Sequence, residues 1–206
     1  MGDRLEFVTL PSKTPQGDFA STVVEGLQKE PKSLPPWLLY DRNGSALFEA
    51  ITDLPEYYLT RTEQALLERH ADAMVEAAGD VQQVVEFGSG SSRKTRLLLE
   101  ALLRRHETVS YVPIDISREF LRASADALLS DYPGLRIRAV SAEYADAVEA
   151  LRHEGLPRLF LFLGSNIGNF DPEDAMAFLH SVVGQMHASG RMLLGFDLVK
   201  DQQVLL

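Results

Sequence analysis

The sequence predicts an α/β fold in which a helical cap precedes a doubly wound parallel sheet. From residue 81 onward, strand-like apolar runs alternate with segments of helical spacing, as in sheets covered by helices on both faces. Two runs, 159–163 and 192–194, are apolar at every position, which is typical of central parallel strands. Before residue 81 the only periodic pattern is helical. We therefore divide the chain into an N-terminal arm with a helical cap (1–80) and a sheet core (81–206).

In the cap, an irregular arm is expected to precede three helices. Residues 1–17 mix proline, serine, lysine and threonine, which favours irregular structure. The prolines within 31–36 interrupt helical spacing, and Pro55-Glu56-Tyr57-Tyr58 is expected to form a loop rich in aromatic residues. The expected helices are Phe19–Lys29, Ser45–Ile51 and Thr62–Ala78, and Gly79 is expected to end the last one.

In the core, five strands are expected to alternate with four helices. The expected strands are Gln83–Phe87, Ser110–Ile114, Arg136–Val140, Leu159–Leu163 and Arg191–Phe196. The expected helices are Lys94–Arg105, Arg118–Tyr132, Ala145–Glu154 and Pro172–Ala188. Ligands of such sheets bind outside the carboxyl ends of the strands, near the point where the strand order reverses.

Length, charge and cysteine content exclude several classes of function. The 206 residues suit one domain, or a domain with a helical extension. A net charge of −10 without a long basic run disfavours nucleic acid as the main partner. The absence of cysteine excludes disulfides and thiolate zinc sites. With no apolar run of membrane-spanning length and no recognisable signal sequence, we expect a cytoplasmic protein that does not bind membranes.

The most informative segment is the turn after the first core strand, Glu86-Phe87-Gly88-Ser89-Gly90. Its glycines let a ligand approach the backbone, and free N–H groups at the following helix start face that ligand. Both common phosphate motifs require a further glycine where this chain has Arg93. The remaining Glu-x-Gly-x-Gly pattern, with Ser89 between the glycines, favours S-adenosylmethionine as the cofactor and a Rossmann-like class I methyltransferase sheet.

Sheets of that class usually finish with two more strands, one of them antiparallel, beside the fifth. Here residues 199–206 resemble the start of another helix, so these C-terminal strands are expected to be missing and the core to be incomplete. An uncovered fifth strand would favour self-association through the open sheet edge. Either the chain is a fragment, or another subunit covers that edge.

Three charged residues near the glycine turn are candidate cofactor ligands. Asp115 ends the second strand, where a carboxylate can accept hydrogen bonds from both ribose hydroxyls; the alternative is an N-cap role. Glu86 could meet the ammonium group of a methionine moiety, or could only orient the turn backbone. Lys94 in the first helical turn opposes the helix dipole unless an anion, such as a ligand carboxylate, accompanies it. A solvated Lys94 remains an equal alternative.

Candidate substrate contacts lie in the cap and in the loop after the fourth strand. That loop contains Asn169, which could hold the methyl acceptor or simply tolerate left-handed geometry in a turn. Tyr40, Tyr57 and Tyr58 could line an active site, although tyrosines more often belong to a core or a surface. The five histidines are scattered without an i,i+4 pair, so no metal site is expected.

Seven motifs together resemble the histidine-specific (L-histidine Nα) methyltransferases of ergothioneine biosynthesis. The matching motifs are Lys32-Ser33-Leu34-Pro35-Pro36, Tyr40-Asp41, Gly44-Ser45-x-Leu47-Phe48, Leu54–Tyr58 with Thr60–Glu63, Gly88-Ser89-Gly90-x-Ser92-x-Lys94-Thr95, Phe162–Ser165 with Ile167–Asn169, and Asp197–Asp201. The resemblance implies transfer of three methyl groups from S-adenosylmethionine to the α-amine of L-histidine, which gives the betaine hercynine. A non-catalytic S-adenosylmethionine-binding remnant or partner subunit, and a methyltransferase for another small amine, are the alternatives.

The resemblance also implies roles for individual residues. Gly88, Lys94, Asp115 and the pair Glu143-Tyr144 would contact the cofactor, and Tyr40 would lie beside its methionine moiety. Tyr57 and Asn169 would bind the amino-acid end of the substrate. Glu143-Tyr144 stands where the family more often has Asp-Phe, and Leu59 where it often has proline. The family's residues that recognise the imidazole ring lie in a C-terminal region beyond residue 206.

Overall fold

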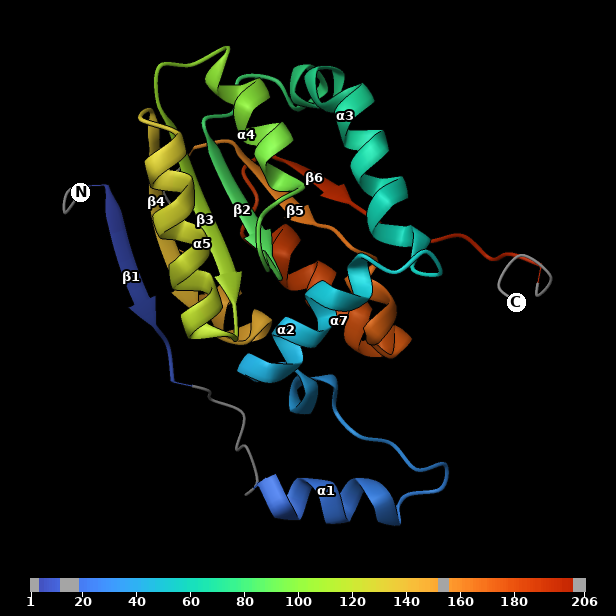
Figure 1. The fold of residues 1–206 in the computed structure, drawn as a ribbon. Coiled ribbons are helices and arrows are strands. Elements are labelled where there is room, and N and C mark those ends of the chain that lie inside the picture. Colours follow the sequence, from blue (N-terminus) through green and yellow to red (C-terminus); the bar gives the residue numbers. More distant parts are fainter. Residues whose placement is uncertain (1–3, 12–18, 152–155, 202–206) are drawn as a thin grey trace.

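The computed structural model describes residues 4–11, 19–151 and 156–201. Its six strands form one sheet in the order β1-β4-β3-β2-β5-β6, with every neighbouring pair parallel (Figure 1). The strands are β1 (Leu5–Thr9), β2 (Gln83–Phe87), β3 (Val109–Asp115), β4 (Leu135–Ser141), β5 (Arg158–Phe162) and β6 (Arg191–Leu194). The predicted α/β sheet is thus confirmed, and its five expected strands match β2 to β6.

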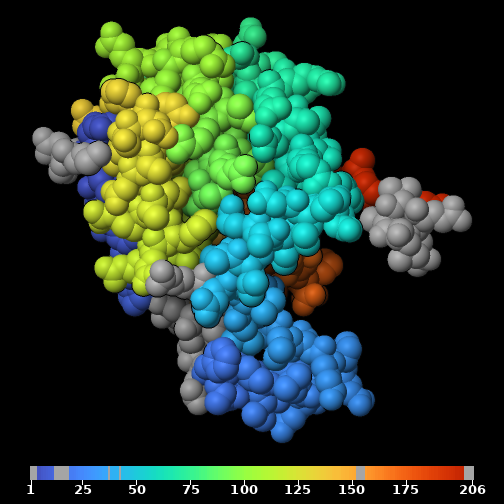
Figure 2. Space-filling view, in the orientation of Figure 1, coloured from blue at the N-terminus to red at the C-terminus, as the bar shows by residue number. Residues whose placement is uncertain are grey.

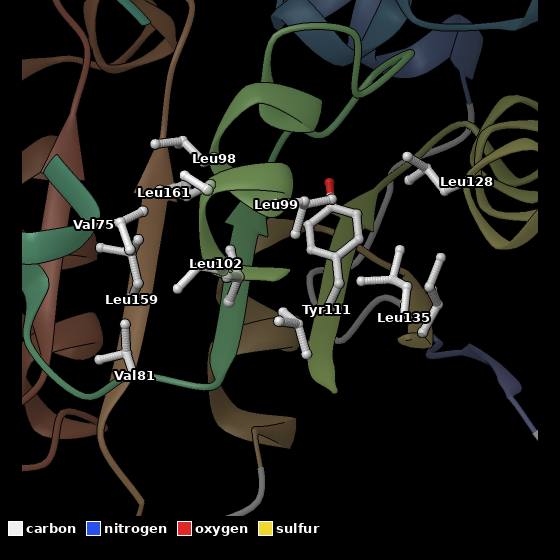
Figure 3. Close-up of a cluster of buried hydrophobic side chains, with 14 of the residues drawn as sticks. Val75, Val81, Leu98, Leu99, Leu102, Tyr111, Leu128, Leu135, Leu159 and Leu161 are labelled. Atoms are coloured by element: carbon white, nitrogen blue, oxygen red, sulfur yellow. The ribbon is translucent and has the colours of Figure 1, made fainter. Parts of the chain in front are cut away.

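Helices cover both faces of this sheet. They are α1 (Phe19–Gln28), α2 (Arg42–Thr52), α3 (Tyr58–Ala78), α4 (Thr95–Leu103), α5 (Arg118–Asp131), α6 (Tyr144–Ala150) and α7 (Pro172–Gly184), with 3-10 turns η1 (Pro36–Leu39) and η2 (Asn166–Asn169). One core cluster joins α3, α4 and α5 to one face through side chains such as Val75, Leu98 and Leu128 (Figure 3). A second cluster joins α6 and α7 to the opposite face. In the described part of the chain, no helix is both long and apolar enough to span a membrane.

The prediction of an irregular arm was wrong for Leu5–Thr9. This segment forms β1 and adds an edge strand beside β4, with Leu5 opposite Ile137 and Thr9 opposite Ser141. The Arg4 guanidinium anchors the strand by donating to backbone carbonyls at the end of α5 and the start of β4, among them Leu129 O at 2.9 Å. Without β1 these carbonyls and the edge of β4 would lack these partners. Residues 12–17 of the expected arm lie outside the described residues.

Two cap helices begin earlier than the sequence predicted. Helix α2 begins at Arg42 because the Asp41 side chain accepts a hydrogen bond from the Gly44 backbone N–H at 2.7 Å, a typical N-cap. Helix α3 begins at Tyr58, which the sequence placed in a loop, and Tyr57 is its N-cap residue. The cap segments α1 and α2 project beyond the carboxyl ends of the strands, and α1 lies farthest from the sheet (Figures 1 and 2).

The strand order reverses at β2, which lies between β3 on one side and β5 on the other. The carboxyl ends of these three strands therefore mark the expected ligand position. On the far side of β5, β6 is an edge strand among the described residues. No helix follows it over Val199–Asp201, contrary to the predicted helical start, and residues 202–206 lie outside the described residues.

Candidate functional site

The glycine turn lies directly after β2, at the point where the strand order reverses. Gly88 and Gly90 have backbone φ angles of 72° and 48°, values that favour glycine. A Cβ on Gly88 would lie 2.5 Å from the Tyr144 hydroxyl, whereas a Cβ on Gly90 would meet open space. Between them Ser89 is buried, and its Oγ has no hydrogen-bond partner. An open backbone beside an unpartnered buried hydroxyl fits a site built to receive a polar ligand.

Glu86 lies just before this turn and is 3% exposed. Two hydroxyl groups donate to its carboxylate, one of them Thr95 Oγ1 at 2.6 Å. Burial raises the pKa of Glu86 to about 7, although these hydrogen bonds and the charge of Lys94 oppose the shift. The side chain also lines the cleft in front of the turn. The structure therefore supports a structural role for Glu86 and leaves its predicted contact with a ligand ammonium as a prediction.

Asp115 ends β3 beside the glycine turn. Its Oδ2 accepts a hydrogen bond from Gly90 N and its Oδ1 accepts one from Ser117 N, each at 2.9 Å. Burial raises the pKa of Asp115, and these backbone hydrogen bonds act in the opposite direction. Ser117 occupies the N-cap position of α5 without a side-chain cap hydrogen bond. Asp115 thus ties the turn to the start of α5, and its predicted role in binding ribose stays a prediction.

Two predicted residues from opposite ends of the chain, Tyr40 and Asn169, meet at the same site. Burial raises the pKa of the Tyr40 hydroxyl, the charge of Asp115 raises it further, and the nearby Asn169 side chain lowers it. Asn169 ends η2, the short helix that follows β5. The pair therefore connects the cap to the loop after β5, where the sequence predicted the amino-acid end of the substrate.

Tyr57 and the glycine turn line one cleft. The Tyr57 ring packs edge-to-face on Phe48 with 6.0 Å between centroids. Burial raises the pKa of the Tyr57 hydroxyl, and Tyr40 and Glu63 raise it further. From the cap the cleft is lined by Phe48, Glu49, Thr52, Tyr57, Leu59, Thr60 and Gln64; from the core it is lined by Glu86, residues 88–95, Leu163, Gly164 and Asn166. The cap thus forms one wall of the candidate site.

Lys94 has an anionic partner within the protein. Its ammonium group pairs with Glu63 of α3, and both side chains are mostly buried. The Glu63 carboxylate also accepts from Gly164 N, at 2.9 Å to Oε1 and 3.0 Å to Oε2. Glu63 therefore joins the cap, the start of α4 and the loop after β5 at one point. The alternative of a solvated Lys94 is wrong, whereas contact with a ligand carboxylate stays a prediction.

Tyr144 belongs to an aromatic cluster beneath the turn. Its ring lies within 6.2 Å of those of Phe87, Phe162, Phe170 and Phe178, centroid to centroid. Burial raises the pKa of its hydroxyl, and the charge of Asp115 adds to the shift. The neighbouring Glu143 is the N-cap residue of α6. The structure thus brings Tyr144 to the glycine turn.

A second contact fastens the cap to the segment after β6. The Tyr58 hydroxyl donates to Asp197, and the Lys200 ammonium lies 4.8 Å from the centre of the Tyr58 ring. Lys200 also pairs with Asp197, which lowers the pKa of that carboxyl, and the Asp197 backbone N–H donates to Ser165 Oγ at 3.1 Å. Tyr58 therefore holds the start of α3 against the core.

Sequence reasoning missed several residues of the site, among them Phe48, Glu63 and Asn166. Glu63 lies in the cap motif that begins at Leu54, but its sequence position gives no sign of a partner 31 residues away. Asn166 is in the loop from which only Asn169 was chosen, and its Nδ2 would lie 2.9 Å from a Cβ on Gly88. The only local signal for Asn166 in the sequence was its position in a loop rich in glycine and asparagine.

Comparisons with known proteins identify the family of this chain. Residues 19–206 match the family described as "Histidine-specific methyltransferase, SAM-dependent". The Mycobacterium tuberculosis "Histidine N-alpha-methyltransferase" is 46% identical over 179 residues, which are 87% of this chain and 55% of that protein. The Neurospora crassa "Ergothioneine biosynthesis protein 1" is 36% identical over 174 residues, which are 83% of this chain and 20% of that protein.

Among solved structures, a DUF574 family protein from Streptomyces avermitilis matches with a TM-score of 0.53 and 16% identity, over 73% of this chain and 61% of that one. This likeness shows the fold alone. The chain spans about half the length of the curated histidine methyltransferases it matches. The family match covers nearly all of the chain and includes the glycine turn, the cap motifs and the loop after β5. The chain therefore belongs to the SAM-dependent, histidine-specific methyltransferases.

Proposed function

We propose that this chain binds S-adenosylmethionine and takes part in Nα-methylation of L-histidine toward hercynine, a step of ergothioneine biosynthesis. One observation carries the proposal: the glycine turn and the cap residues Phe48 and Tyr57 line the same cleft. The names of the two relatives, one a histidine methyltransferase and one an ergothioneine biosynthesis protein, support the same substrate.

The residues around the turn fit the parts of this cofactor. The unpartnered Ser89 hydroxyl and the exposed backbone at Gly90 offer hydrogen-bonding groups, and the remaining lone pairs of Asp115 can accept from ribose hydroxyls. Glu86 would face the ammonium group and Lys94 the carboxylate of the methionine moiety. Glu143 and Tyr144 would line the adenine end. When bound, the cofactor supplies a methyl group already activated by its sulfonium.

The chain's own task is then to hold a neutral amine in line with that methyl group. Tyr57 and Asn169 would hold the amino-acid end of histidine, with Tyr40 beside Asn169. The half-buried aromatic wall formed by Tyr57 and Phe48 disfavours the charged form of an amine beside it. Such a wall would help keep the attacking amine neutral.

The test is mass spectrometry of histidine incubated with the 206-residue chain and S-adenosylmethionine. Gains of one to three methyl groups are expected, and the Asn169→Ala variant should lose them while still binding S-adenosylhomocysteine. Cofactor binding without any methylation would favour a non-catalytic remnant or partner subunit. Faster methylation of tryptophan or leucine than of histidine would favour another small amine as the acceptor. Tight ATP binding without S-adenosylhomocysteine binding would contradict the proposal altogether.

We also propose that two copies of the chain associate through the edge strand β6. A groove beside this strand is lined by Leu66, Leu67 and Met74 of α3 and by Leu193, Leu194 and Phe196. Phe196 and Leu198 are more than 60% exposed, so the edge is flanked by apolar side chains. Sedimentation should show a dimer that weakens when Phe196 is replaced by Lys. A stable monomer at high concentration would contradict this proposal.

A cytoplasmic location stays a prediction, based on the absence of cysteine.

A further inference from the structure

A chain of hydrogen-bonded side-chain hydroxyl groups, all buried except for the partly buried Ser124, ends on Glu86. Thr95 Oγ1 donates to Oε1 of the carboxylate at 2.6 Å, and the Tyr111 hydroxyl donates to Oε2. On the other side of Tyr111, Ser92 Oγ lies 3.0 Å from the Tyr111 hydroxyl, and Ser124 Oγ of α5 donates to Ser92 Oγ at 3.2 Å. The chain therefore runs from α5 through the glycine turn and β3 to the end of β2.

The number of protons gives this chain a direction. Each hydroxyl group has one proton to donate. Because the Tyr111 hydroxyl donates to Glu86, Ser92 must donate to Tyr111, and Ser92 in turn accepts from Ser124. All these donors are satisfied when the Glu86 carboxylate is ionised and serves as the final acceptor. A protonated Glu86 would instead have to donate to one of these hydroxyl groups, and donation to Tyr111 would reverse the direction of the hydrogen bonds.

Ser92 links this chain to the conformation of the glycine turn. Its φ is 53°, in the left-handed region that residues other than glycine seldom adopt. Ser92 N donates to Ser89 O at 2.8 Å, and the residue is 3% exposed. The hydrogen bond between Ser92 and Tyr111 therefore helps to hold a strained residue of the turn in place.

We propose that Tyr111 is a positioning residue of the cofactor site, whose hydroxyl holds both the Glu86 carboxylate and the left-handed Ser92. The Tyr111 ring is fully buried, and Figure 3 shows it between Leu99 and Leu135. Tyr111 therefore acts on the site through Glu86 and Ser92. The proposal rests on the proposed function, in which Glu86 faces the ammonium group of the cofactor. Tyr111 would thus support the cofactor site without contacting the ligand itself.

The surroundings of Glu86 predict how loss of the hydroxyl would be detected. Its hydrogen bonds with Thr95 and Tyr111 lower the pKa of the carboxyl against the larger effect of burial. Removal of the Tyr111 hydroxyl therefore raises this pKa, and more of the carboxyl is neutral at a given pH. The charged or titratable groups that face Glu86 are Tyr111, Lys94, Glu63 and Tyr144. Except for Tyr111, they are the same in the wild type and in the variant.

The test is calorimetry with S-adenosylhomocysteine at about pH 6 and about pH 8. In Tyr111→Phe, the Kd at pH 6 divided by the Kd at pH 8 should exceed the wild-type ratio by up to roughly tenfold in all, because the wild-type carboxyl, with a pKa of about 7, already changes its ionisation between these two pH values. Titration of the ligand itself cancels in this comparison. Tyr132→Phe is the matched control, because it removes a tyrosine hydroxyl that donates to another carboxylate, Glu100. That variant should keep the wild-type ratio.

Thr95 provides an independent variant at the other carboxylate oxygen. Thr95→Val should enlarge the Kd ratio as Tyr111→Phe does, and Thr95→Ser, which keeps a hydroxyl, should restore it. This pair carries the test if Tyr111→Phe fails to fold. A wild-type ratio in both Tyr111→Phe and Thr95→Val would overturn the positioning role, while leaving the proposed function intact. Failure of the wild type to bind S-adenosylhomocysteine would overturn both.

Discussion

Replacement of Gly88 by Ala tests the geometry of the glycine turn. A Cβ at this position would lie 2.5 Å from the Tyr144 hydroxyl and 2.9 Å from Asn166 Nδ2. The φ of 72° adds the left-handed penalty of roughly 1–2 kcal/mol. Gly90→Ala carries a similar penalty at φ 48°, but nothing lies within 4 Å of its Cβ. The two variants therefore differ mainly in steric overlap.

The expected magnitudes follow from this difference. Gly90→Ala should lower the free energy of unfolding by about 1–2 kcal/mol. Gly88→Ala should lower it by about 2–5 kcal/mol, because overpacking adds roughly 1–3 kcal/mol. In Gly88→Ala, Tyr144 and Asn166 must also shift, so binding of S-adenosylhomocysteine should be lost or strongly weakened. Urea unfolding and calorimetry measure the two effects separately.

A second substitution sharpens the comparison. Tyr144→Phe removes the oxygen that would lie nearest to the new Cβ, and the next ring atom, Cζ, would lie at an ordinary 3.5 Å. The double variant Gly88→Ala/Tyr144→Phe should therefore recover part of the lost stability, although the contact with Asn166 remains. Equal stabilities of Gly88→Ala and Gly90→Ala, or no recovery in the double variant, would refute this reasoning.

Three further predictions concern charged residues of the site. Asp115→Ala should weaken binding of S-adenosylhomocysteine by roughly 1.5–3 kcal/mol. Ser117→Ala, at an N-cap position without a side-chain hydrogen bond, should change the affinity little. If calorimetry finds equal affinities for Asp115→Ala and the wild type, the ribose contact lies elsewhere. The pKa of Glu86 is raised from 4.5 to about 7 in the folded chain, so its neutral form favours folding. This contribution to stability is fully present below about pH 4.5 and is lost as the pH rises toward 7. Urea unfolding across this range should show a fall in the free energy of unfolding that is absent in Glu86→Gln. Glu63→Gln removes the charge that pairs with Lys94 but keeps an acceptor for Gly164 N, so it should destabilise the free chain by about 1 kcal/mol. It should also strengthen S-adenosylhomocysteine binding, because Lys94 is then free to pair with the ligand carboxylate. Weaker binding would show that Lys94 does not contact the ligand.

The sequence by itself determined the parts of this protein that depend on local pattern. Alternating apolar runs and helical spacing located β2 to β6, and β2 was predicted at its observed bounds, Gln83–Phe87. The glycine turn and Asp115 follow directly from strand ends, and parallel strands bring their carboxyl ends to one edge of the sheet. The position of the candidate site could therefore be predicted from the order of residues along the chain.

Only the tertiary structure decided which side chains meet. Glu63 reaches Lys94 across 31 residues, and Tyr111 reaches Glu86 across 25, and neither pairing has a local signature. The residues of β1 lie in an arm rich in proline, serine, lysine and threonine, so local pattern did not identify them as a strand. They become one because the edge of β4 offers hydrogen-bonding partners. Burial then sets the chemistry, since the same carboxyl in solvent would keep an ordinary pKa, whereas Glu86 in the core titrates near 7. Sequence pattern fixes where the chain turns, and packing determines how the charges and hydroxyls at that turn are paired.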